Sequence, residues 1–476
     1  MAISPVIVWF RQDLRLRDNP ALAHAVASDA PIVPVFIWAP DEEGAWAPGA
    51  ASRWWLRQSL AGFDGALRGH GSRLILRHGP TLPALRALLR ETGATAVVWN
   101  RRYEPASIAR DTEVKQALLD QGIDARSFNG ALLHAPNAVA NQSGRPFQVF
   151  TPFWKHVGAL RVRDELHGPG GTLPEPARWP ASEPLDAFGL KPAIPWDQEF
   201  PDHWQPGEVG AQAALARFLG EDLAGYAVER DRPDRRGTSR LSPHLHYGEI
   251  GPVQVWHAVR RAGGGPGAEV FLKELGWREF AHHLLFHFPH TSDQPLRPEF
   301  ARFPWSDDRT GLRAWQRGRT GYPIVDAGMR ELWNTGWMHN RVRMIVASFL
   351  VKHLRVHWLE GARWFWDTLV DADLAANTLG WQWSAGCGAD AAPYFRVFNP
   401  ILQGAKFDPD GAYVRRHVPE LARMPAAHIH APWEAPAHVL RSAGVELGRT
   451  YPRPCVEHKP AREAALAAFA ELKKGG

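Results

Sequence analysis

The run Val6-Ile7-Val8-Trp9-Phe10 decides the fold of the first part of the chain. All five side chains are apolar, and an unbroken apolar run of this length is typical of a strand buried on both faces of a parallel sheet. Strand-like stretches recur downstream, and stretches with helical periodicity lie between them. This alternation predicts a doubly wound α/β domain with a parallel sheet over residues 1–130. The expected strands are 6–10, 32–38, 73–76 and 96–99, and the expected helices are 20–28, 52–68, 82–91 and 111–121.

No Gly-x-Gly-x-x-Gly follows the first strand, so the nicotinamide-binding fingerprint is missing from this domain. After this domain the sequence pattern changes twice, first to a connector and then to a helical part. Residues 167–206 are rich in proline and glycine, which indicates an inter-domain connector, placed at 131–208. Residues 209–476 have mostly helical periodicity and predict an all-α domain. The helices expected there are 211–219, 252–261, 269–288, 324–333, 341–353, 361–369 and 371–379.

Composition excludes several classes of protein. Hydrophobic residues make up 45% of the 476 residues and charged residues 22%, a globular mixture. No stretch approaches the roughly 20 apolar residues of a membrane span, and the first residues do not resemble a secretion signal. The two cysteines, Cys387 and Cys455, exclude a disulfide framework and favour a reducing cytoplasm. A net charge of +5 permits a polyanionic partner without requiring one.

Tryptophan is unusually frequent. The chain has 22 tryptophans, and nine of them fall between Phe300 and Ser384. Leucine or phenylalanine fills a core equally well and has no N–H group to satisfy. The indoles are therefore expected either to stack on bases or a cofactor ring, or to pass electrons; an aromatic-rich helical core is the alternative.

Two segments combine polar side chains in patterns that suit a ligand. Gly237–Pro243 contains three hydroxyls and an arginine, with Pro243 suited to the first turn of a helix; this favours an anion site, or an ordinary helix cap. In 371–377, Asp373 and Asn377 are four residues apart and are expected to share a helix face, where the small Ala375 and Ala376 admit a flat ligand. The alternative is a cap with solvated acids. No histidine stands at ligand spacing, so we expect no metal site.

Two further segments have both a functional and a plain interpretation. On 337–344, Asn340 and Met344 share a helix face beside Arg343, which suits a base edge and a phosphate, or simply an amphipathic helix. Glu274 and Arg278 are four residues apart, and this spacing favours a surface ion pair as the default interpretation. In a dry cleft, Glu274 is able to hold a proton and donate it to a carbonyl.

Taken together, these segments resemble the photolyase/cryptochrome family over nearly the whole chain. The motifs that carry the resemblance are Trp9–Arg15, Gly237–Pro243, Trp277–Phe280, Gly318–Pro323, Gly336–Met344, Asp371–Trp383, Gly388–Arg396 and Val456–His458. Arg53-Trp54-Trp55-Leu56 and Val370-Asp371-Ala372-Asp373 resemble the bacterial class III members, which are close to plant cryptochromes. The resemblance implies an N-terminal α/β domain, a connector and a helical domain holding a U-shaped FAD.

The resemblance also assigns cofactor positions. Arg343 and Asp371 match an ion pair beside the isoalloxazine, and Asn377 faces its central ring nitrogen. Phe271 replaces a tryptophan found in some relatives. The positions expected at FAD are Tyr226, Thr238, Ser239, Arg240, Leu241, Ser242, Phe271, Arg278, Trp337, Asn340, Arg343, Asp371, Ala372, Asp373 and Asn377.

Other positions match an electron relay and a lesion pocket. Trp381, Trp358 and Trp305 match an electron-transfer chain from flavin to surface, whereas Trp333, Trp364 and Trp366 match no family role and are expected in the core. Glu274, Asn340, Met344 and Asn377 match catalytic positions. The positions expected to contact DNA holding a flipped-out cyclobutane pyrimidine dimer are Arg230, Glu274, Trp277, Arg278, Asn340, Arg341, Met344, Trp383 and Gln403.

The resemblance therefore implies a light-driven lyase that splits cyclobutane pyrimidine dimers in DNA, acting as a cytoplasmic monomer without a membrane span. A blue-light receptor is the main alternative; Asn377 in place of aspartate, and the end of the chain at Gly476, disfavour it. Repair of (6-4) photoproducts is a second alternative, and a light-independent flavin oxidoreductase a third. Ala106 and Ser107 replace the Asn-Glu pair that binds folate in one enterobacterial branch, so methenyltetrahydrofolate is expected as antenna in a different arrangement.

Overall fold

The computed structural model describes residues 3–391 and 395–474. The chain forms two compact units. The first comprises Met1–Ala224, Ser239–Pro289 and Val370–Leu374, and the second comprises Gly225–Thr238, His290–Leu369 and Ala375–Gly476. The short segment that carries Asp371 and Asp373 therefore belongs to the first unit.

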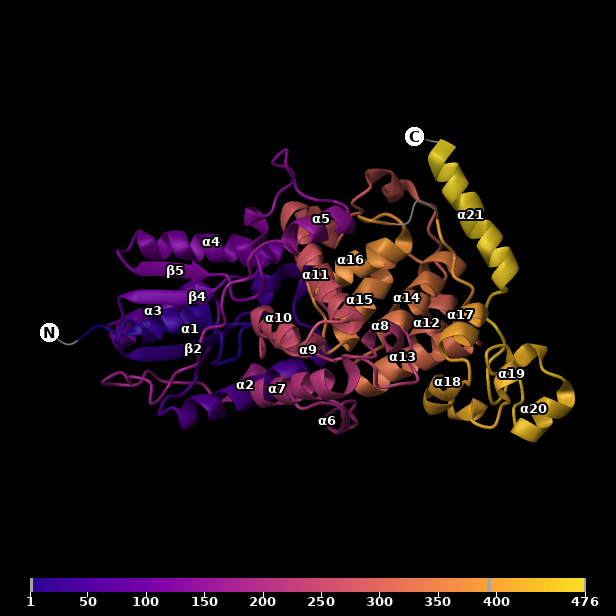
Figure 1. Ribbon diagram of the computed structural model, residues 1–476, viewed down its shortest axis with the longest axis horizontal. Coiled ribbons are helices and arrows are strands. Elements are labelled where there is room, and N and C mark those ends of the chain that lie inside the picture. The colour runs from indigo at the N-terminus through magenta and orange to yellow at the C-terminus, as the bar shows by residue number, and fades with distance from the viewer. Residues whose placement is uncertain (1–2, 392–394, 475–476) are drawn as a thin grey trace. The chain divides into compact units, whose positions relative to one another are not determined.

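The first unit is built on a five-stranded parallel sheet with the strand order β3-β2-β1-β4-β5 (Figure 1). This confirms the predicted doubly wound sheet, and four of its strands lie within two residues of the predicted positions. The fifth, β5, was not predicted. The strands are β1 (Val6–Phe10), β2 (Ile32–Trp38), β3 (Ile75–His78), β4 (Ala96–Asn100) and β5 (Asp124–Phe128).

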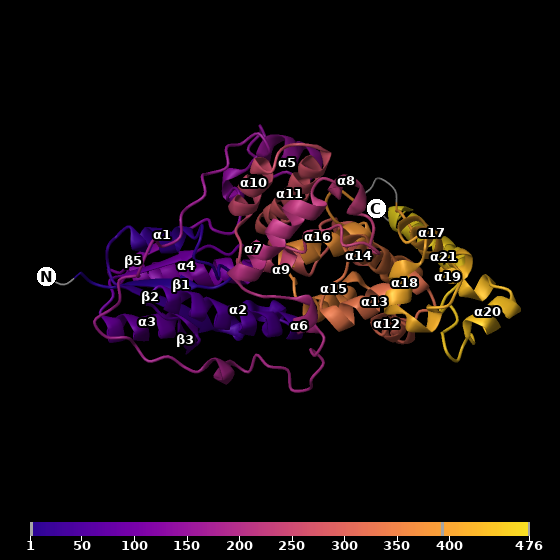
Figure 2. The same ribbon diagram turned by 60° about the horizontal axis from the view of Figure 1, so that its bottom comes forward.

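Helices cover both faces of this sheet (Figure 2). Ile7 and Trp9 of β1 pack into one hydrophobic cluster with side chains of α3 and α4, whereas Phe10 contacts Phe63 of α2 with ring centroids 4.7 Å apart. Alternate side chains of β1 thus meet helices on opposite faces, which explains its unbroken apolar run. The helices of this unit are α1 (Pro20–Val26), α2 (Ala50–Gly69), α3 (Thr81–Thr92), α4 (Pro105–Leu119), α5 (Phe150–Val157), α6 (Phe200–His203), α7 (Glu208–Arg217), α9 (Ser242–His246), α10 (Pro252–Arg261) and α11 (Pro266–His287).

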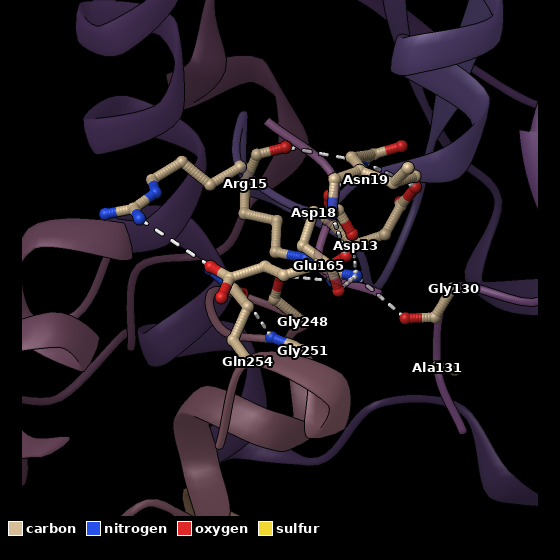
Figure 3. Close-up of polar contacts among 12 residues, drawn as sticks. Asp13, Arg15, Asp18, Asn19, Gly130, Ala131, Glu165, Gly248, Gly251 and Gln254 are labelled. Carbon is tan, nitrogen blue, oxygen red and sulfur yellow. Dashed lines mark hydrogen bonds and ion pairs between the residues drawn. The ribbon is translucent and has the colours of Figure 1, made fainter. Parts of the chain in front are cut away.

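The loop after β1 is fixed by a buried polar network (Figure 3). The guanidinium of Arg15, which is 1% exposed, donates to the carbonyls of Gly248 (2.9 Å), Asp18 (2.8 Å) and Gly130 (2.8 Å). Gly248 has φ +64°, and a Cβ there would lie 2.2 Å from the Gln12 carbonyl oxygen. One side chain therefore ties the β1 loop to two segments that are distant in sequence.

The second unit is helical throughout its named elements. Its central helix, α13, is buried over most of its length and packs against α14, α17 and α18. This confirms the predicted helical C-terminal part. The helices are α8 (Tyr226–Glu229), α12 (Arg309–Gln316), α13 (Pro323–Thr335), α14 (Asn340–Ser348), α15 (Trp358–Thr368), α16 (Leu374–Ala385), α17 (Pro400–Phe407), α18 (Ala412–His417), α19 (Ala426–Ile429), α20 (Ala437–Ala443) and α21 (His458–Lys474).

Several helix boundaries differ from the predictions. The helix expected at 371–379 begins at Leu374, and the one expected at 341–353 ends at Ser348, where a π-helical turn over Phe349–His353 continues it. The helix expected at 111–121 begins at Pro105, because proline suits the first turn of a helix. Among the described residues, no helix has the length and apolar character that a membrane crossing requires.

Candidate functional site

The segment before α9 has an unusual backbone. Arg240 adopts φ +53°, in the left-handed region that non-glycine residues rarely enter, and such conformations gather at ligand sites. The Ser239 hydroxyl accepts from the backbone N–H of Leu241 at 3.3 Å. Pro243 stands in the first turn of α9, as predicted, but the N-cap is Leu241, which has no capping oxygen. The interpretation as an ordinary hydroxyl-capped helix therefore does not hold, and Ser239 instead orders the turn itself.

Asp373 lies in a polar pocket of the first unit. Its Oδ2 atom is 3.5 Å from both His246 Nδ1 and His282 Nε2. Burial alone would raise the pKa of Asp373, but His282, His246 and Arg278 together hold that pKa well below its usual range. A buried carboxylate between two imidazoles is thus kept ionised and oriented. The residues that line this pocket include Gln12, Asn100, Arg102, Glu104, His246 and Asp373.

The prediction that Asp373 and Asn377 share a helix face is wrong. α16 begins at Leu374, so Asp373 precedes the helix while Asn377 lies within it. Aspartate side chains compete with the helical backbone for hydrogen bonds and therefore favour helix starts over helix interiors. Asp371 and Ala372 lie in the same non-helical segment, 7% and 2% exposed.

Asn377 has a defined amide orientation. Its Nδ2 group donates to the backbone carbonyl of Ala362 at 3.0 Å. Because the N–H end of the amide faces α15, the Oδ1 end is directed to the other side as an acceptor. An acceptor at this position fits the N–H of a reduced flavin ring, so the residue present suits the cofactor that the resemblance implies.

The predicted relay tryptophans show a graded burial. Trp381 and Trp358 are 2% and 1% exposed, whereas Trp305 is half-buried. Trp381 lies against α15, where a Cβ on Gly361 would be 2.1 Å from its indole, one helical turn from Trp358. His357 lies between the other two indoles, 5.0 Å from Trp305 and 5.7 Å from Trp358 by ring centroids. This order from interior to surface is the one that electron hopping requires.

One expectation about the remaining tryptophans is wrong. Trp333 was assigned to the core with Trp364 and Trp366, yet it is 51% exposed. It stacks on Trp364 with ring centroids 6.1 Å apart and planes 11° apart. The two indoles thus form a surface pair joining α13 and α15.

The first half of α14 carries three of the predicted DNA-contacting residues, Asn340, Arg341 and Met344. Arg341 donates through Nη2 to Asp231 at 2.7 Å, and its guanidinium lies 4.5 Å from the centroid of Phe407. Its Nη1 group is 3.7 Å from the Met344 sulfur. Asn340, in the same turn, is exposed. The structure therefore brings Arg341 and Met344 together and adds Asp231 and Phe407, which the sequence did not single out.

Further predicted residues of the second unit come from several of its elements. Arg343 donates to the Met338 carbonyl at 2.7 Å, and its guanidinium is 5.9 Å from the ring of Trp337. Gln403 lies four residues before Phe407, on the same face of α17. The remaining predicted residues here are Tyr226, whose ring is 5.6 Å from the Arg230 guanidinium, then Arg230 itself, Thr238 and the half-buried Trp383.

α11 carries four predicted site residues of the first unit, Phe271, Glu274, Trp277 and Arg278. Trp277 is half-buried and stacks on Phe150 with ring centroids 3.7 Å and planes 8° apart. Arg278 donates to the carbonyl of Ala131 at 2.8 Å. Glu274 is half-buried on the same helix, and Phe271 packs on Phe218 with centroids 4.5 Å apart.

The predicted site residues are thus divided between the two units, and a shared flavin site formed by both sets stays a prediction. Sequence reasoning missed several residues that contact predicted ones, among them His246, His282, Phe218, Phe150, Asp231, His357 and Phe407. Phe150 and Asp231 lie far along the chain from their partners, and only the fold reveals those contacts. His357 directly precedes Trp358 in the sequence, and this adjacency could have identified it as a neighbour of the predicted relay.

Comparisons with known proteins agree with this architecture. Residues 6–174 match the family model described as DNA photolyase, and residues 271–471 match the one described as FAD binding domain of DNA photolyase. The chain is 52% identical to a deoxyribodipyrimidine photo-lyase of Agrobacterium fabrum, over 99% of this chain and 98% of the relative. It is 42% identical to cryptochrome-2 of Arabidopsis thaliana, over 98% of this chain and 79% of the relative.

A solved structure gives the same result. The crystal structure of a bacterial class III photolyase from Agrobacterium tumefaciens superposes with a TM-score of 0.96 at 51% identity, covering 100% of this chain and 98% of the other. The chain belongs to the photolyase/cryptochrome family. The family models also confirm FAD as the expected cofactor.

Proposed function

We propose that this protein is a light-driven lyase that splits cyclobutane pyrimidine dimers in DNA into their monomers. The likeness over almost the full length to an enzyme named deoxyribodipyrimidine photo-lyase carries the proposal. The orientation of Asn377, with its amide oxygen left as an acceptor, supports the same conclusion.

The chemistry that bound, fully reduced FAD would supply is donation of a light-excited electron to the dimer. The residues of this chain would hold the FAD and set its electronic properties. Asn377 would accept a ring N–H through Oδ1, and Arg343 and Asp371 would lie beside the ring as the charged pair that the family resemblance implies. Trp381, Trp358 and Trp305 conduct electrons between the interior and the surface. The turn at Thr238, Ser239, Arg240, Leu241 and Ser242 binds the phosphates through backbone N–H groups and hydroxyls, while Tyr226, Phe271, Arg278, Trp337, Asn340, Ala372 and Asp373 complete the cofactor contacts.

The lesion contacts follow from the chemistry of their side chains. Trp277 and Trp383 offer flat faces on which the flipped-out bases stack. Glu274 and Asn340 form hydrogen bonds with the pyrimidine edge, and Met344 supplies an apolar contact. Glu274 stabilises negative charge that builds on a dimer carbonyl, as a hydrogen-bond donor in a dry site does. Arg230, Arg278, Arg341 and Gln403 hold the strand.

The test uses purified holoprotein with bound flavin, a reductant and an oligonucleotide that contains one thymine dimer. Under blue light we expect the dimer to be converted to two thymines over many turnovers, with no conversion in the dark. Parallel reactions with a (6-4) photoproduct are expected to leave it intact. No conversion of the dimer by protein with demonstrably reduced flavin contradicts the proposal.

The same reactions decide the second candidate, a blue-light receptor, which the 42% identity to a plant cryptochrome favours. A receptor would show light-dependent changes in flavin absorption without dimer turnover. Asn377, where we expect signalling relatives to have an acid, disfavours that result.

We further propose that methenyltetrahydrofolate serves as antenna in an N-terminal domain of residues 1–130. The connector at 131–208 leads from it to the FAD- and DNA-binding domain at 209–476. An absorption band in the near ultraviolet, lost after the pigment is extracted while FAD remains, tests the antenna. We also propose that the protein works as a monomer in the cytoplasm. Sedimentation of the holoprotein tests whether it is a monomer.

A further inference from the structure

The contact between Trp277 and Phe150 is closer than ordinary aromatic packing. The two ring centroids are 3.7 Å apart and the planes 8° apart, whereas aromatic pairs prefer offset or edge-to-face arrangements at larger separations. Phe150 is 7% exposed at the first position of α5, and its ring also packs edge-on against Phe280 at 5.8 Å. The indole of Trp277 is thus pressed flat against a buried ring.

The helices themselves impose this contact. α5 packs on α11 where Gly276 leaves room, because a Cβ on Gly276 would lie 2.3 Å from Cε3 of Trp154. Trp154 in turn lies nearly parallel to Phe150, with planes 9° apart and centroids at 6.4 Å. The neighbouring Trp256 of α10 packs edge-on against Trp154 at 6.3 Å. The plane of Phe150, and through it that of Trp277, is therefore fixed by packing between helices.

One face of Trp277 is consequently covered by protein, while the side chain as a whole stays half-buried. A planar ligand has only the opposite face on which to stack. An indole already held in one plane loses little conformational freedom when a base stacks on it, and such preorganisation strengthens binding.

We propose that Phe150 is a positioning residue for lesion recognition: it backs the indole of Trp277 and holds the opposite face ready for the flipped pyrimidine dimer. This inference rests on the proposed function, since it takes Trp277 to be a stacking wall for the dimer. Phe150 itself does not touch the substrate and acts only through Trp277.

The experiment compares Phe150→Leu with Phe153→Leu in full-length holoprotein. Leucine keeps an apolar side chain but has no flat face. Phe153 is a matched control, because it lies on the same helix, is 2% exposed and packs its ring on Phe280 and His283, whereas Phe150 is the ring that stacks on Trp277. The readout is lesion discrimination, defined as the ratio of affinities for dimer-containing and undamaged oligonucleotides of the same sequence.

We expect Phe150→Leu to lower discrimination about tenfold, in line with the loss of one well-made base stack. Affinity for undamaged DNA and FAD content should stay unchanged. Phe153→Leu should keep discrimination, and Phe150→Tyr, which keeps a ring, should restore most of it. In a Trp277→Ala background, Phe150→Leu should cause no further loss, because its effect passes through the indole.

Wild-type discrimination in folded Phe150→Leu holoprotein overturns the inference, as does an equal loss in the Trp277→Ala background. If Phe150→Leu cannot be purified with bound flavin, Phe150→Met replaces it in these measurements. A wild-type protein that does not distinguish the dimer at all contradicts the proposed function itself, so the two failures remain distinguishable.

Discussion

At the scale of single residues, the amide of Asn377 is the feature on which we base the expectation of repair over signalling. Its N–H end donates to the Ala362 carbonyl, so its oxygen end is the acceptor that we propose for a flavin N–H. An aspartate at this position has two acceptor oxygens and a negative charge, which disfavours an anionic reduced ring beside it. We therefore predict that Asn377→Asp holds the fully reduced flavin less readily than wild type, as measured by absorption during anaerobic photoreduction. A variant that retains the reduced state equally well contradicts this.

Glu279 gives the first unit a predictable dependence on pH. Burial raises the pKa of this carboxyl to about 7, against an ordinary 4.5, although Arg278 and the N–H groups of Leu133 and His134 lower it in part. The folded state thus binds the proton more tightly than the unfolded chain. The resulting stabilisation, on the order of 3 kcal/mol, is fully present below pH 4.5 and is lost as the pH rises through about 7.

Glu279→Gln should remove this dependence, because glutamine keeps an acceptor for both N–H groups and has no proton to lose. We expect its free energy of unfolding to decline less than that of wild type between pH 5 and pH 8, measured by urea titration at each pH. Glu113→Gln, at an exposed position of α4, is the control and should follow wild type. Parallel pH profiles for wild type and Glu279→Gln would refute the assignment.

At the scale of elements, the loop after β1 depends on one buried guanidinium (Figure 3). Arg15→Met removes three hydrogen bonds to carbonyls and leaves those oxygens buried, so we predict a loss of about 3 kcal/mol or more in unfolding free energy. Arg17→Met, two residues on, changes a side chain that is 59% exposed and should cost within about 0.5 kcal/mol. Equal stability of the two variants in thermal unfolding would show that the network is dispensable.

The predicted relay also depends on whole elements, because Trp381 of α16 lies against Gly361 of α15, one helical turn from Trp358. Trp381→Phe should slow photoreduction of oxidised flavin at least about tenfold, since phenylalanine is far harder to oxidise than tryptophan. Enzyme reduced chemically beforehand should still repair dimers, because the relay is needed only to load electrons. Trp99→Phe in β4 serves as the control. Undiminished photoreduction in Trp381→Phe would exclude Trp381 from the relay.

The limits of sequence reasoning also lie at the scale of elements. β1, β2 and most of β4 were predictable because their side chains are apolar and buried on both faces of the sheet. β5 (Asp124–Phe128) was missed because it is an edge strand with exposed Asp124 and Arg126. The start of α16 was misplaced because a local pattern does not reveal which carboxylate precedes a helix and which lies within it.

For the whole molecule, the long-range contacts are what the sequence could not supply. The family motifs indicated Trp277 and Arg341, but no periodicity links them to Phe150 and Asp231, which come from distant segments of the chain. These contacts complete a site by orienting its members. They determine which face of the Trp277 indole is covered by Phe150 and which carboxylate pairs with the Arg341 guanidinium.

Net charge at this scale is a weak guide to DNA binding. The 55 basic residues are nearly balanced by 50 acidic ones, so affinity for the backbone must come from a few local cations. We propose Arg341 as one of these cations. Its ion pair with Asp231 is partly exposed, at 21% and 38%. Such a pair contributes little to folding, so a phosphate can replace the carboxylate. We predict that Arg341→Gln lowers the slope of log affinity against log salt concentration by about 1 and weakens damaged and undamaged DNA alike. Arg441→Gln, at an exposed position of α20, should leave the slope unchanged, and an unchanged slope in Arg341→Gln would remove this residue from the strand contacts.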